Sequence, residues 1–230
     1  MMTHVENRSE ARLLTDRLVK GVTRGSRHGR QEALSEVGGQ LQIVLEGAVL
    51  RQRFLPDGRC QTVAVYHRDD VINLSRFVHH GAAETDLLVA LKGAVVGTVN
   101  PEEVERLRRL SLRGVDGMAA LVLRELAISQ ERLVSLGRRS ATEAMAHFMC
   151  ETLLRSRRPS DNCPELSCSL AMSQDTMGTV LGLSSVHVNR TLQELRQLHL
   201  ADHSNFELVI YDFDRLAFIG GFDDGYLTPV

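Results

Sequence analysis

The sequence has 230 residues, of which 43% are hydrophobic and 24% are charged, and its formal net charge is −2 at pH 7. This composition excludes wholesale disorder, and because no apolar run reaches about 18 residues we expect no membrane-spanning helix. It also excludes a nucleic-acid binder that relies on overall basic charge, so any attraction to such a partner has to be local.

Neither the start of the chain nor its cysteines indicate a secreted protein. Residues 1–21 contain no apolar core followed by a small-residue cleavage site, so we expect no secretory signal. The four cysteines form no CxxC pair, which argues against a zinc knuckle and favours reduced thiols in a cytoplasmic protein. We therefore expect no metal site and no cofactor.

Residues 8–30 are predicted to begin with an amphipathic helix. Leu13, Leu14 and Leu18 recur at helical spacing between basic residues. We interpret the basic residues as the solvated face of a helix that docks through its leucines.

Residues 39–99 contain short apolar segments separated by turns. We expect strands at 40–47, 48–55, 61–66, 87–91 and 94–99. The segment Pro-Asp-Gly at 56–58 is typical of a turn, and Lys92-Gly93 between the last two strands predicts a hairpin. Many short strands at this spacing indicate an antiparallel barrel or roll.

The segment after these strands is predicted to be helical. Residues 100–102, Asn-Pro-Glu, form a helix start with Asn as the cap and Pro at the first helical position. We expect this helix to end near residue 110, an interruption at Gly114 and Gly117, and a second helix over 118–136. The apolar stripe of the second helix needs a partner, either its own barrel or the same helix of a second chain.

A change of structural unit is expected near residues 137–139. Gly137 ends the preceding helix, and the segment 140–143, Ser-Ala-Thr-Glu, matches a capping box that opens the next one. Residues 155–164 form a polar linker with two prolines. The chain is therefore expected to divide into residues 1–137 and residues 138–230.

The segment 173–200 predicts two short helices joined by a glycine turn. Ser173 caps the first helix, Gly182 supplies the turn and Ser184 caps the second helix. The apolar residues of the second helix recur at spacings of four and three and face inward: Val188, Leu192 and Leu195. This arrangement is typical of a helix-turn-helix, whose second helix enters the major groove of DNA.

The outer face of the second helix, at about 184–197, carries side chains suited to DNA. Arg190 is able to donate to O6 and N7 of a guanine, and Asn189 to read an adenine or hold a phosphate. Ser185 and His187 are short enough to donate to phosphates at the helix N-terminus. The alternative is a plain helical hairpin with a hydrated polar side, and the cancelling charges of the segment leave that alternative open.

Two further elements follow the helix-turn-helix. Residues 200–203 and 206–210 flank Ser204-Asn205 and predict a small hairpin, a candidate wing. Asp212 is the expected cap of a last helix. Together these elements complete a winged helix-turn-helix.

At three places the sequence resembles the Crp/Fnr family of bacterial transcription regulators. The segment LGLSSVHVNRTLQELR at 181–196 is close to the recognition-helix motif of that family. The segment LEGAVLRQRFLPDGRCQTVAVYHRDDVINL at 45–74 is similar to its effector-domain roll, and GRRSATEAMAHF at 137–148 resembles the helix that opens its DNA-binding half. The resemblance covers nearly the whole chain, in the order of the family.

The resemblance implies an α+β fold with three parts. These are an N-terminal antiparallel β-roll of the cyclic-nucleotide-binding type, a long dimerisation helix at about 115–136 and a C-terminal winged helix-turn-helix. It also implies a homodimer that binds double-stranded DNA at a pseudo-palindromic site, with its two recognition helices one helical turn apart. RNA polymerase is the further partner that such a regulator implies.

The recognition helix departs from the family members that read the best-known half-site. Where those proteins have Arg, Glu and a second Arg, this sequence has Ser185, Val186 and Arg190. Val186 is able to offer only an apolar contact where the Glu would accept a hydrogen bond from cytosine. We therefore expect a different half-site, read by Arg190 with His187 or Asn189.

The cyclic-nucleotide cassette of the family is also incomplete. No Gly-Glu pair follows Asn73, and Glu84-Thr85 stands where the resemblance places an Arg and a hydroxyl residue for the cyclic phosphate. A carboxylate at that place repels the phosphate that the Arg would bind. We expect that cyclic AMP does not control the protein, and the identity of any small-molecule effector stays open.

Two other functions are alternatives to DNA binding. An enzyme has no support from the common catalytic motifs, and His147 and Cys150, three residues apart on a predicted helix, lack a third orienting group. A regulator-like module whose recognition helix docks a protein partner agrees with the neutral charge of that segment. Salt dependence distinguishes the two, since DNA binding weakens steeply as salt rises.

Overall fold

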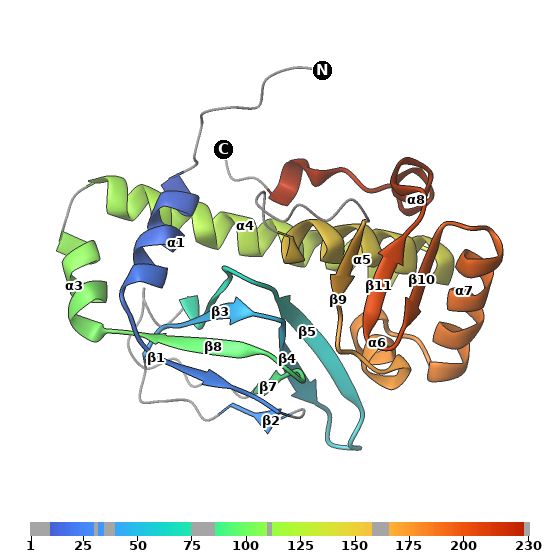
Figure 1. The fold of residues 1–230 in the computed structure, drawn as a ribbon, viewed down its shortest axis with the longest axis horizontal. Helices are drawn as coiled ribbons and strands as arrows, with labels where there is room; N and C mark the ends of the chain where they lie inside the picture. The colour runs from blue at the N-terminus through green and yellow to red at the C-terminus, as the bar shows by residue number, and fades with distance from the viewer. Residues whose placement is uncertain are drawn as a thin grey trace.

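The computed structural model describes residues 10–29, 32–34, 40–74, 86–109, 112–157 and 166–227 (Figure 1). Strands dominate the first half of this part of the chain, and helices dominate the second. The predicted α+β fold class, with an antiparallel roll followed by a helix-turn-helix, is confirmed.

In the described part of the roll, eight strands form two antiparallel sheets. The sheet orders are β1-β8-β3-β6 and β2-β7-β4-β5. The strands are β1 (Val22–Arg27), β2 (Glu32–Ala33), β3 (Gln42–Glu46), β4 (Val49–Phe54), β5 (Cys60–Tyr66), β6 (Val71–Ile72), β7 (Leu87–Ala90) and β8 (Val95–Val99). Each predicted strand is therefore present, with its ends shifted by one or two residues.

The predicted hairpin around Lys92-Gly93 is wrong. The turn itself exists, since Gly93 has a φ of 83° and the nitrogen of Ala94 donates to the oxygen of Leu91 at 2.9 Å. However, β7 pairs with β2 and β4, whereas β8 pairs with β1 and β3. Leu88 and Val96 lie in one buried cluster, so the turn carries the chain between the two facing sheets instead of pairing adjacent strands.

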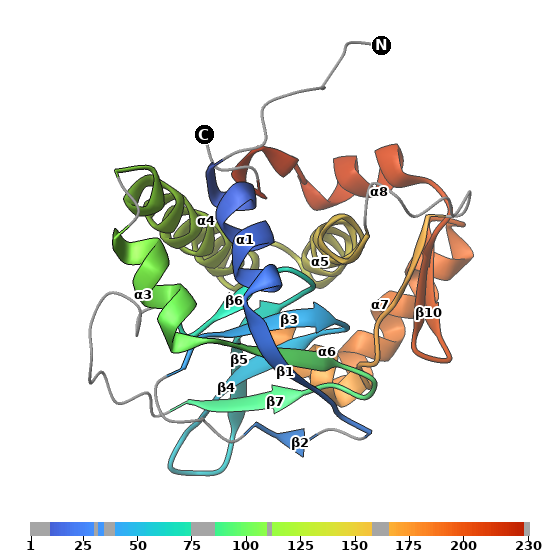
Figure 2. The same ribbon diagram turned by 60° about the vertical axis from the view of Figure 1, so that its left-hand side comes forward.

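Within the described ranges, three helices accompany the roll. They are α1 (Glu10–Lys20), α3 (Pro101–Arg109) and α4 (Leu112–Gly137). Helix α1 lies beside α4 (Figure 2). Leu14 and Leu18 of α1 are buried against α4 as predicted, whereas the third predicted leucine, Leu13, is exposed. The side chain of Asn100 accepts a hydrogen bond from the nitrogen of Glu102 at 2.9 Å, which confirms the predicted cap of α3.

The predicted interruption at Gly114 and Gly117 is also wrong. Helix α4 begins at Leu112 and continues through both glycines to Gly137. Glycine costs a helix only about 1 kcal/mol per residue. Burial of Met118 and Leu121 against the roll stabilises α4 by a comparable amount or more.

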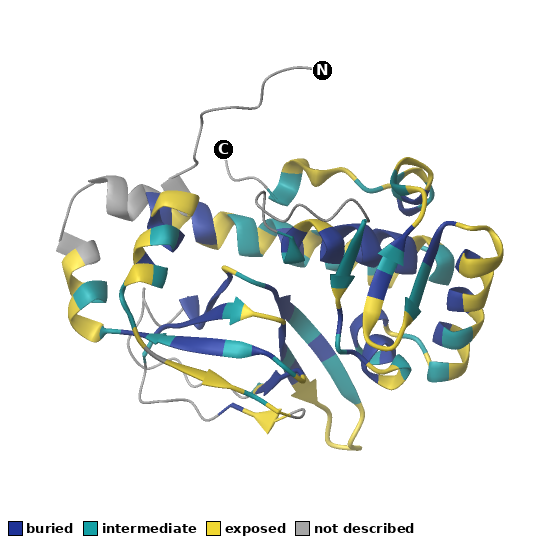
Figure 3. Cartoon of the chain, viewed as in Figure 1, coloured by how far each residue is buried: buried dark blue, intermediate teal, exposed yellow. Residues whose placement is uncertain are grey.

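The second half of the chain forms a winged unit around helix α5 (Ala141–Ser156). Ser140 and Glu143 make the predicted capping box, and most of α5 is buried (Figure 3). The other elements are α6 (Gln174–Leu181), α7 (Ser185–Gln197), α8 (Phe213–Gly220), the strands β9 (Ser167–Ser169), β10 (Ala201–Ser204) and β11 (Glu207–Ile210), and the short helix η1 (Asp224–Leu227). Of the predicted linker, residues 158–164 lie outside the described part.

The segment after α8 returns over α4 and α5. Arg124 of α4 donates to the backbone oxygen of Leu227 at 3.0 Å, and the hydroxyl of Tyr226 donates to Glu151 of α5 at 2.7 Å. The ring of Tyr226 stacks on His147 with centroids 6.0 Å apart. These contacts hold the C-terminal segment across the junction of the long helix and the winged unit.

Gly220 allows α8 to approach α5 closely. A Cβ atom there would lie 2.6 Å from the backbone nitrogen of His147 and 2.9 Å from its Cα. We expect Gly220→Ala to lower the free energy of unfolding by about 1–3 kcal/mol, because the two helices must move apart. Urea unfolding followed by circular dichroism measures the change. Gly137→Ala is the control, since a Cβ there meets nothing within 4 Å; equal stability of the two variants would contradict the prediction.

No helix in the described ranges is long and apolar enough to cross a membrane.

Candidate nucleic-acid interface

The predicted caps and turn of the helix-turn-helix are confirmed. The hydroxyl of Ser173 accepts from the nitrogen of Thr176 at 3.1 Å, and that of Ser184 accepts from the nitrogen of His187 at 3.4 Å. Gly182 ends α6 in the left-handed conformation, with a φ of 67°. These local interactions fix where α6 ends and where α7 begins.

A second glycine sets the distance between α6 and the turn. The nitrogen of Leu183 donates to the oxygen of Gly178 at 3.0 Å. A Cβ atom on Gly178 would lie 2.5 Å from the oxygen of Leu183, so this close approach requires glycine. Sequence reasoning did not single out Gly178, because its role depends on a contact with the next segment.

One face of α7 is buried and the other is exposed. Val188, Leu192 and Leu195 are buried as predicted, and Thr191 joins them. On the outer face, Val186 is 76% exposed and both His187 and Arg190 are exposed. The first turns of α7 are therefore exposed, as major-groove reading by a helix-turn-helix would require.

The four predicted DNA-contacting residues differ in their surroundings. Arg190 makes no hydrogen bond or ion pair with the described residues, so its guanidinium is available. Ser185 is half-buried, and Nδ1 of His187 lies 3.0 Å from the hydroxyl of Ser184. The amide of Asn189 donates to Gln174 of α6 at 3.2 Å and accepts from Gln193 at 2.9 Å. Asn189 thus links α6 to α7 in this structure.

The second arginine of α7 is engaged within the protein. Nε of Arg196 donates to Asp202 of β10 at 2.9 Å, and its Nη2 forms a second contact with the same carboxylate. This ion pair ties α7 to the wing. Arg190 is therefore the one arginine of α7 without an ion-pair partner in the described part of the chain.

The predicted wing is confirmed and extended by one strand. Strands β10 and β11 pair antiparallel, and β9 pairs with the other edge of β11. Asn205 and Phe206 make the turn with positive φ angles of 52° and 65°. Strand β9 was not predicted, because three residues after a polar linker carry too short a pattern.

A buried group of charges joins the roll to the winged unit. Asp70 accepts from Arg155 of α5 at 2.6 Å and from Arg124 of α4 at 2.7 Å. Arg155 also donates to the backbone oxygen of Val65 at 3.0 Å and pairs with Glu151. The sequence analysis did not single out Asp70, because the two arginines lie 54 and 85 positions away from it.

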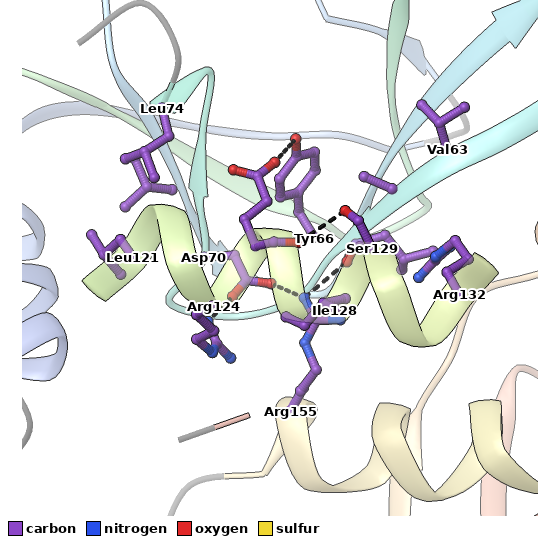
Figure 4. Close-up of a pocket in the computed structure, with 14 residues that line it drawn as sticks. Val63, Tyr66, Asp70, Leu74, Leu121, Arg124, Ile128, Ser129, Arg132 and Arg155 are labelled. Carbon is purple, nitrogen blue, oxygen red and sulfur yellow. Dashed lines mark hydrogen bonds and ion pairs between the residues drawn. The ribbon is translucent and has the colours of Figure 1, made fainter. Parts of the chain in front are cut away.

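The cavity beside these charges is small (Figure 4). It lies between β5 and α4 and has a volume of about 40 Å³, which holds a few water molecules. The hydroxyl of Tyr66 donates to Glu125 at 3.0 Å along its wall. Glu84 and Thr85, the positions considered for a cyclic phosphate, lie outside the described residues.

His147 and Cys150 do not form a catalytic pair. Their side chains are buried, and burial raises the pKa of the Cys150 thiol to about 12. A neutral thiol is a weak nucleophile. In the described ranges, no group of three His, Cys, Asp or Glu side chains is placed to hold a metal ion.

Relatives of known sequence are regulators. The Crp-like helix-turn-helix domain family matches residues 143–219. The chain is 30% identical over 161 residues to the nitrogen fixation regulation protein FixK of Bradyrhizobium diazoefficiens, a match that spans 67% of this chain and 62% of FixK. It is 26% identical over 179 residues to the transcriptional activatory protein AadR of Rhodopseudomonas palustris, spanning 74% of this chain and 70% of AadR.

Solved structures show the same fold. FixK2 from Bradyrhizobium japonicum superposes with a TM-score of 0.71 and 23% identity over 85% of this chain and 96% of that chain. A transcriptional regulator of the CRP family from Thermus thermophilus gives a TM-score of 0.63 and 20% identity over 85% and 96%. These structures show the fold, and the relatives by sequence are regulators and not enzymes. Residues 143–219 belong to the Crp-like helix-turn-helix domain family, and together with the FixK relative this match supports a transcription regulator of the Crp/Fnr family.

Proposed function

We propose that the protein is a homodimeric, sequence-specific DNA-binding regulator that reads a pseudo-palindromic site with α7. The observation that carries the proposal is the unpaired, exposed Arg190 on a capped helix within a Crp-like helix-turn-helix. Arg190 would read a guanine, with Ser185, His187 and Asn189 in supporting contacts. Residues 1–137 and 138–230 would be the effector and DNA-binding domains.

Helix α4 supports the dimer in this proposal. One side of α4 buries Met118, Leu121 and Ile128. The other side leaves Leu123, Leu126 and Leu133 exposed at 61%, 51% and 68%. Their spacings of three and seven residues suit the seam of a two-helix coiled coil. A two-fold axis beside α4 would place two copies of α7 on successive major grooves.

The described part of the roll supports the proposal that cyclic AMP is not the effector. Its cavity of about 40 Å³ is far below the roughly 300 Å³ at which ligand pockets begin. Its lining carboxylates, Asp70 and Glu125, lie beside three arginines, two of which are paired with Asp70, so the volume and not the charge disfavours cyclic AMP. RNA polymerase is the partner, and the cytoplasm the location, that a bacterial regulator of this kind would have.

Arg190→Ala tests DNA reading. We expect the substitution to cost about 1–3 kcal/mol of binding free energy on the preferred site and to relax the preference at one base position, because a bidentate contact is lost. Selection of genomic fragments by the purified protein identifies the site, and fluorescence anisotropy measures the affinity. Arg215→Ala in α8 is the control, since that exposed arginine lies outside α7.

Two results would change the proposal. Equal losses on all sequences would make Arg190 a phosphate contact. If no symmetric site is enriched, docking of a protein partner becomes the better function, which the exposed Val186 and the paired Arg196 also suit. In that case, binding to the partner should change little with salt, whereas DNA binding weakens steeply.

A further inference from the structure

A second cavity lies between the roll and the winged unit. Its volume is about 280 Å³, and it is bounded by the turn between β3 and β4, by Arg68, by the end of α5 and by β9. It differs from the small cavity beside α4, with which it shares no lining residue. Both halves of the chain therefore contribute to one space, whose volume is close to the lower limit of about 300 Å³ for ligand pockets and suits only a small molecule.

Arg68 lines this cavity without a partner. Its side chain is half-buried and its Nε atom is fully buried with no hydrogen-bond acceptor. The guanidinium makes no ion pair with the described residues. Nε is too enclosed to reach a ligand in the cavity, but the two Nη nitrogens also have no acceptor among the described residues. Native proteins nearly always pair a partly buried cationic donor, and an anion in the cavity would pair these two nitrogens.

The other groups around the cavity favour an anion as well. Arg157, the C-cap of α5, brings a second guanidinium. Ser167 and Ser169 add hydroxyl groups that are able to donate, whereas the hydroxyl of Ser156 already lies 3.2 Å from Nδ1 of His67. The carboxylate of Glu46 is bonded to Arg27 at 2.7 Å, which offsets its charge. Burial raises the pKa of the Cys168 thiol to about 11, so that group is neutral.

We propose that this cavity binds a small phosphate-bearing anion, held by Arg68 and Arg157 and by the serine hydroxyls. Guanidinium groups match phosphate oxygens with paired, charge-assisted hydrogen bonds. Because Arg68 belongs to the roll and Arg157 to the winged unit, the anion would bridge the two halves. It would therefore stabilise the relative placement of the halves that this structure has.

Binding at this site does not depend on DNA reading by α7. It would affect DNA affinity only if the two halves are placed differently on DNA, and the coupling would then be reciprocal. The two functions are therefore separable by experiment: loss of anion binding leaves the Arg190 contact intact, and loss of Arg190 leaves the cavity intact.

Calorimetric titration of the full chain tests the proposal. Inorganic phosphate and glycerol 3-phosphate are titrated in separate runs, with sodium chloride at matched ionic strength as the blank. We expect saturable binding of one anion per chain. The ligand that binds more tightly shows whether the site takes a free phosphate ion or a phosphate ester.

Three variants locate the site. Arg68→Gln and Arg157→Gln each remove one charge and should weaken binding about tenfold or more. Ser169→Asp places a carboxylate at an exposed position of β9 beside the cavity and should abolish binding by repulsion. Arg138→Gln is the matched control, because Arg138 is exposed and does not line the cavity.

The result that would overturn the proposal is equally definite. No saturable heat with either anion, or an affinity unchanged in both Arg68→Gln and Ser169→Asp, would show that the cavity is not an anion site. Circular dichroism melting of each variant establishes that it is folded. If Arg68→Gln does not fold, Arg157→Gln and Ser169→Asp decide the outcome.

Discussion

Replacing Asp70 by alanine is expected to lower the free energy of unfolding by about 3–5 kcal/mol, the usual cost of removing one partner of a buried ion pair. Asp70 is only 6% exposed and accepts hydrogen bonds from Arg155 and Arg124. It also accepts from the backbone nitrogen of His67 at 2.7 Å. Without the carboxylate, Arg124 loses the carboxylate with which it pairs at the junction of roll, long helix and winged unit, and Arg155 keeps only Glu151.

Urea unfolding at fixed protein concentration measures this loss. Asp57→Ala is the control, because Asp57 pairs with Arg59 at 2.7 Å on an exposed turn. Exposed pairs contribute about 0–1 kcal/mol, so the control should change little. If the two variants lose the same stability, the buried charges are not holding the units together.

The buried carboxylates of Asp70 and Glu151 also make the stability of the protein depend on pH. Burial alone would raise the pKa of Asp70, but Arg155 and Arg124 outweigh it and hold that pKa well below its usual range. Burial alone would also raise the pKa of Glu151, but Arg155 and Arg132 outweigh it and lower that pKa to about 2. Groups with a lowered folded pKa stabilise the protein above the unfolded value of about 4, and this stabilisation is lost as pH falls toward the folded value. Between about pH 4 and pH 2, the free energy of unfolding should therefore fall more steeply with decreasing pH in the parent than in Asp70→Ala.

The elements that the sequence predicts well are those decided by neighbouring residues. Ser140, Ser173, Ser184 and Asp212 each cap the helix expected of them, because a cap acts on the backbone nitrogen two or three positions later. The inward face of α7 follows from a spacing within one helix in the same way. For this reason the helix-turn-helix and its outer face are visible without a structure.

The features that the sequence does not predict depend on distant residues. Helix α4 continues through its glycines because its face packs on the roll, which lies earlier in the chain. The Lys92-Gly93 turn crosses between sheets because β7 and β8 find their partners elsewhere. The pairing of Asp70 with Arg155 spans 85 positions. A single sequence contains no signal for such long-range pairings.

In the candidate interface, too, local spacing predicts some features and distant residues determine the others. That Arg190 faces outward follows from helical spacing, and its exposure agrees with the prediction. The same spacing also places Asn189 and Arg196 on the surface, where the structure shows them bonded to Gln174 and Asp202. Both partners belong to other elements, α6 and β10, whose positions only the fold determines.

The double substitution of Leu126 and Leu133 by glutamate is expected to convert the protein to a monomer and to weaken DNA binding about a hundredfold or more. The two leucines lie seven residues apart on α4, exposed at 51% and 68%, on the side that does not pack on the roll. Burying each against a second chain would contribute about 1.5–3 kcal/mol, and charges at the same place repel across the two-fold axis. Because two linked half-site contacts gain about 10²–10⁴ in avidity over one, loss of the dimer removes that gain.

Analytical ultracentrifugation and fluorescence anisotropy on the selected site measure the two effects. Phe218→Glu is the matched control, since Phe218 is 87% exposed on α8 and carries no part of the seam. It should leave both the mass and the affinity unchanged. The leucines of α4 act only through the second chain, so the affinity of the double variant should equal that of the parent for an isolated half-site. A double variant that stays dimeric, or a monomer that keeps full affinity for the symmetric site, would contradict the role of α4 as the dimer helix.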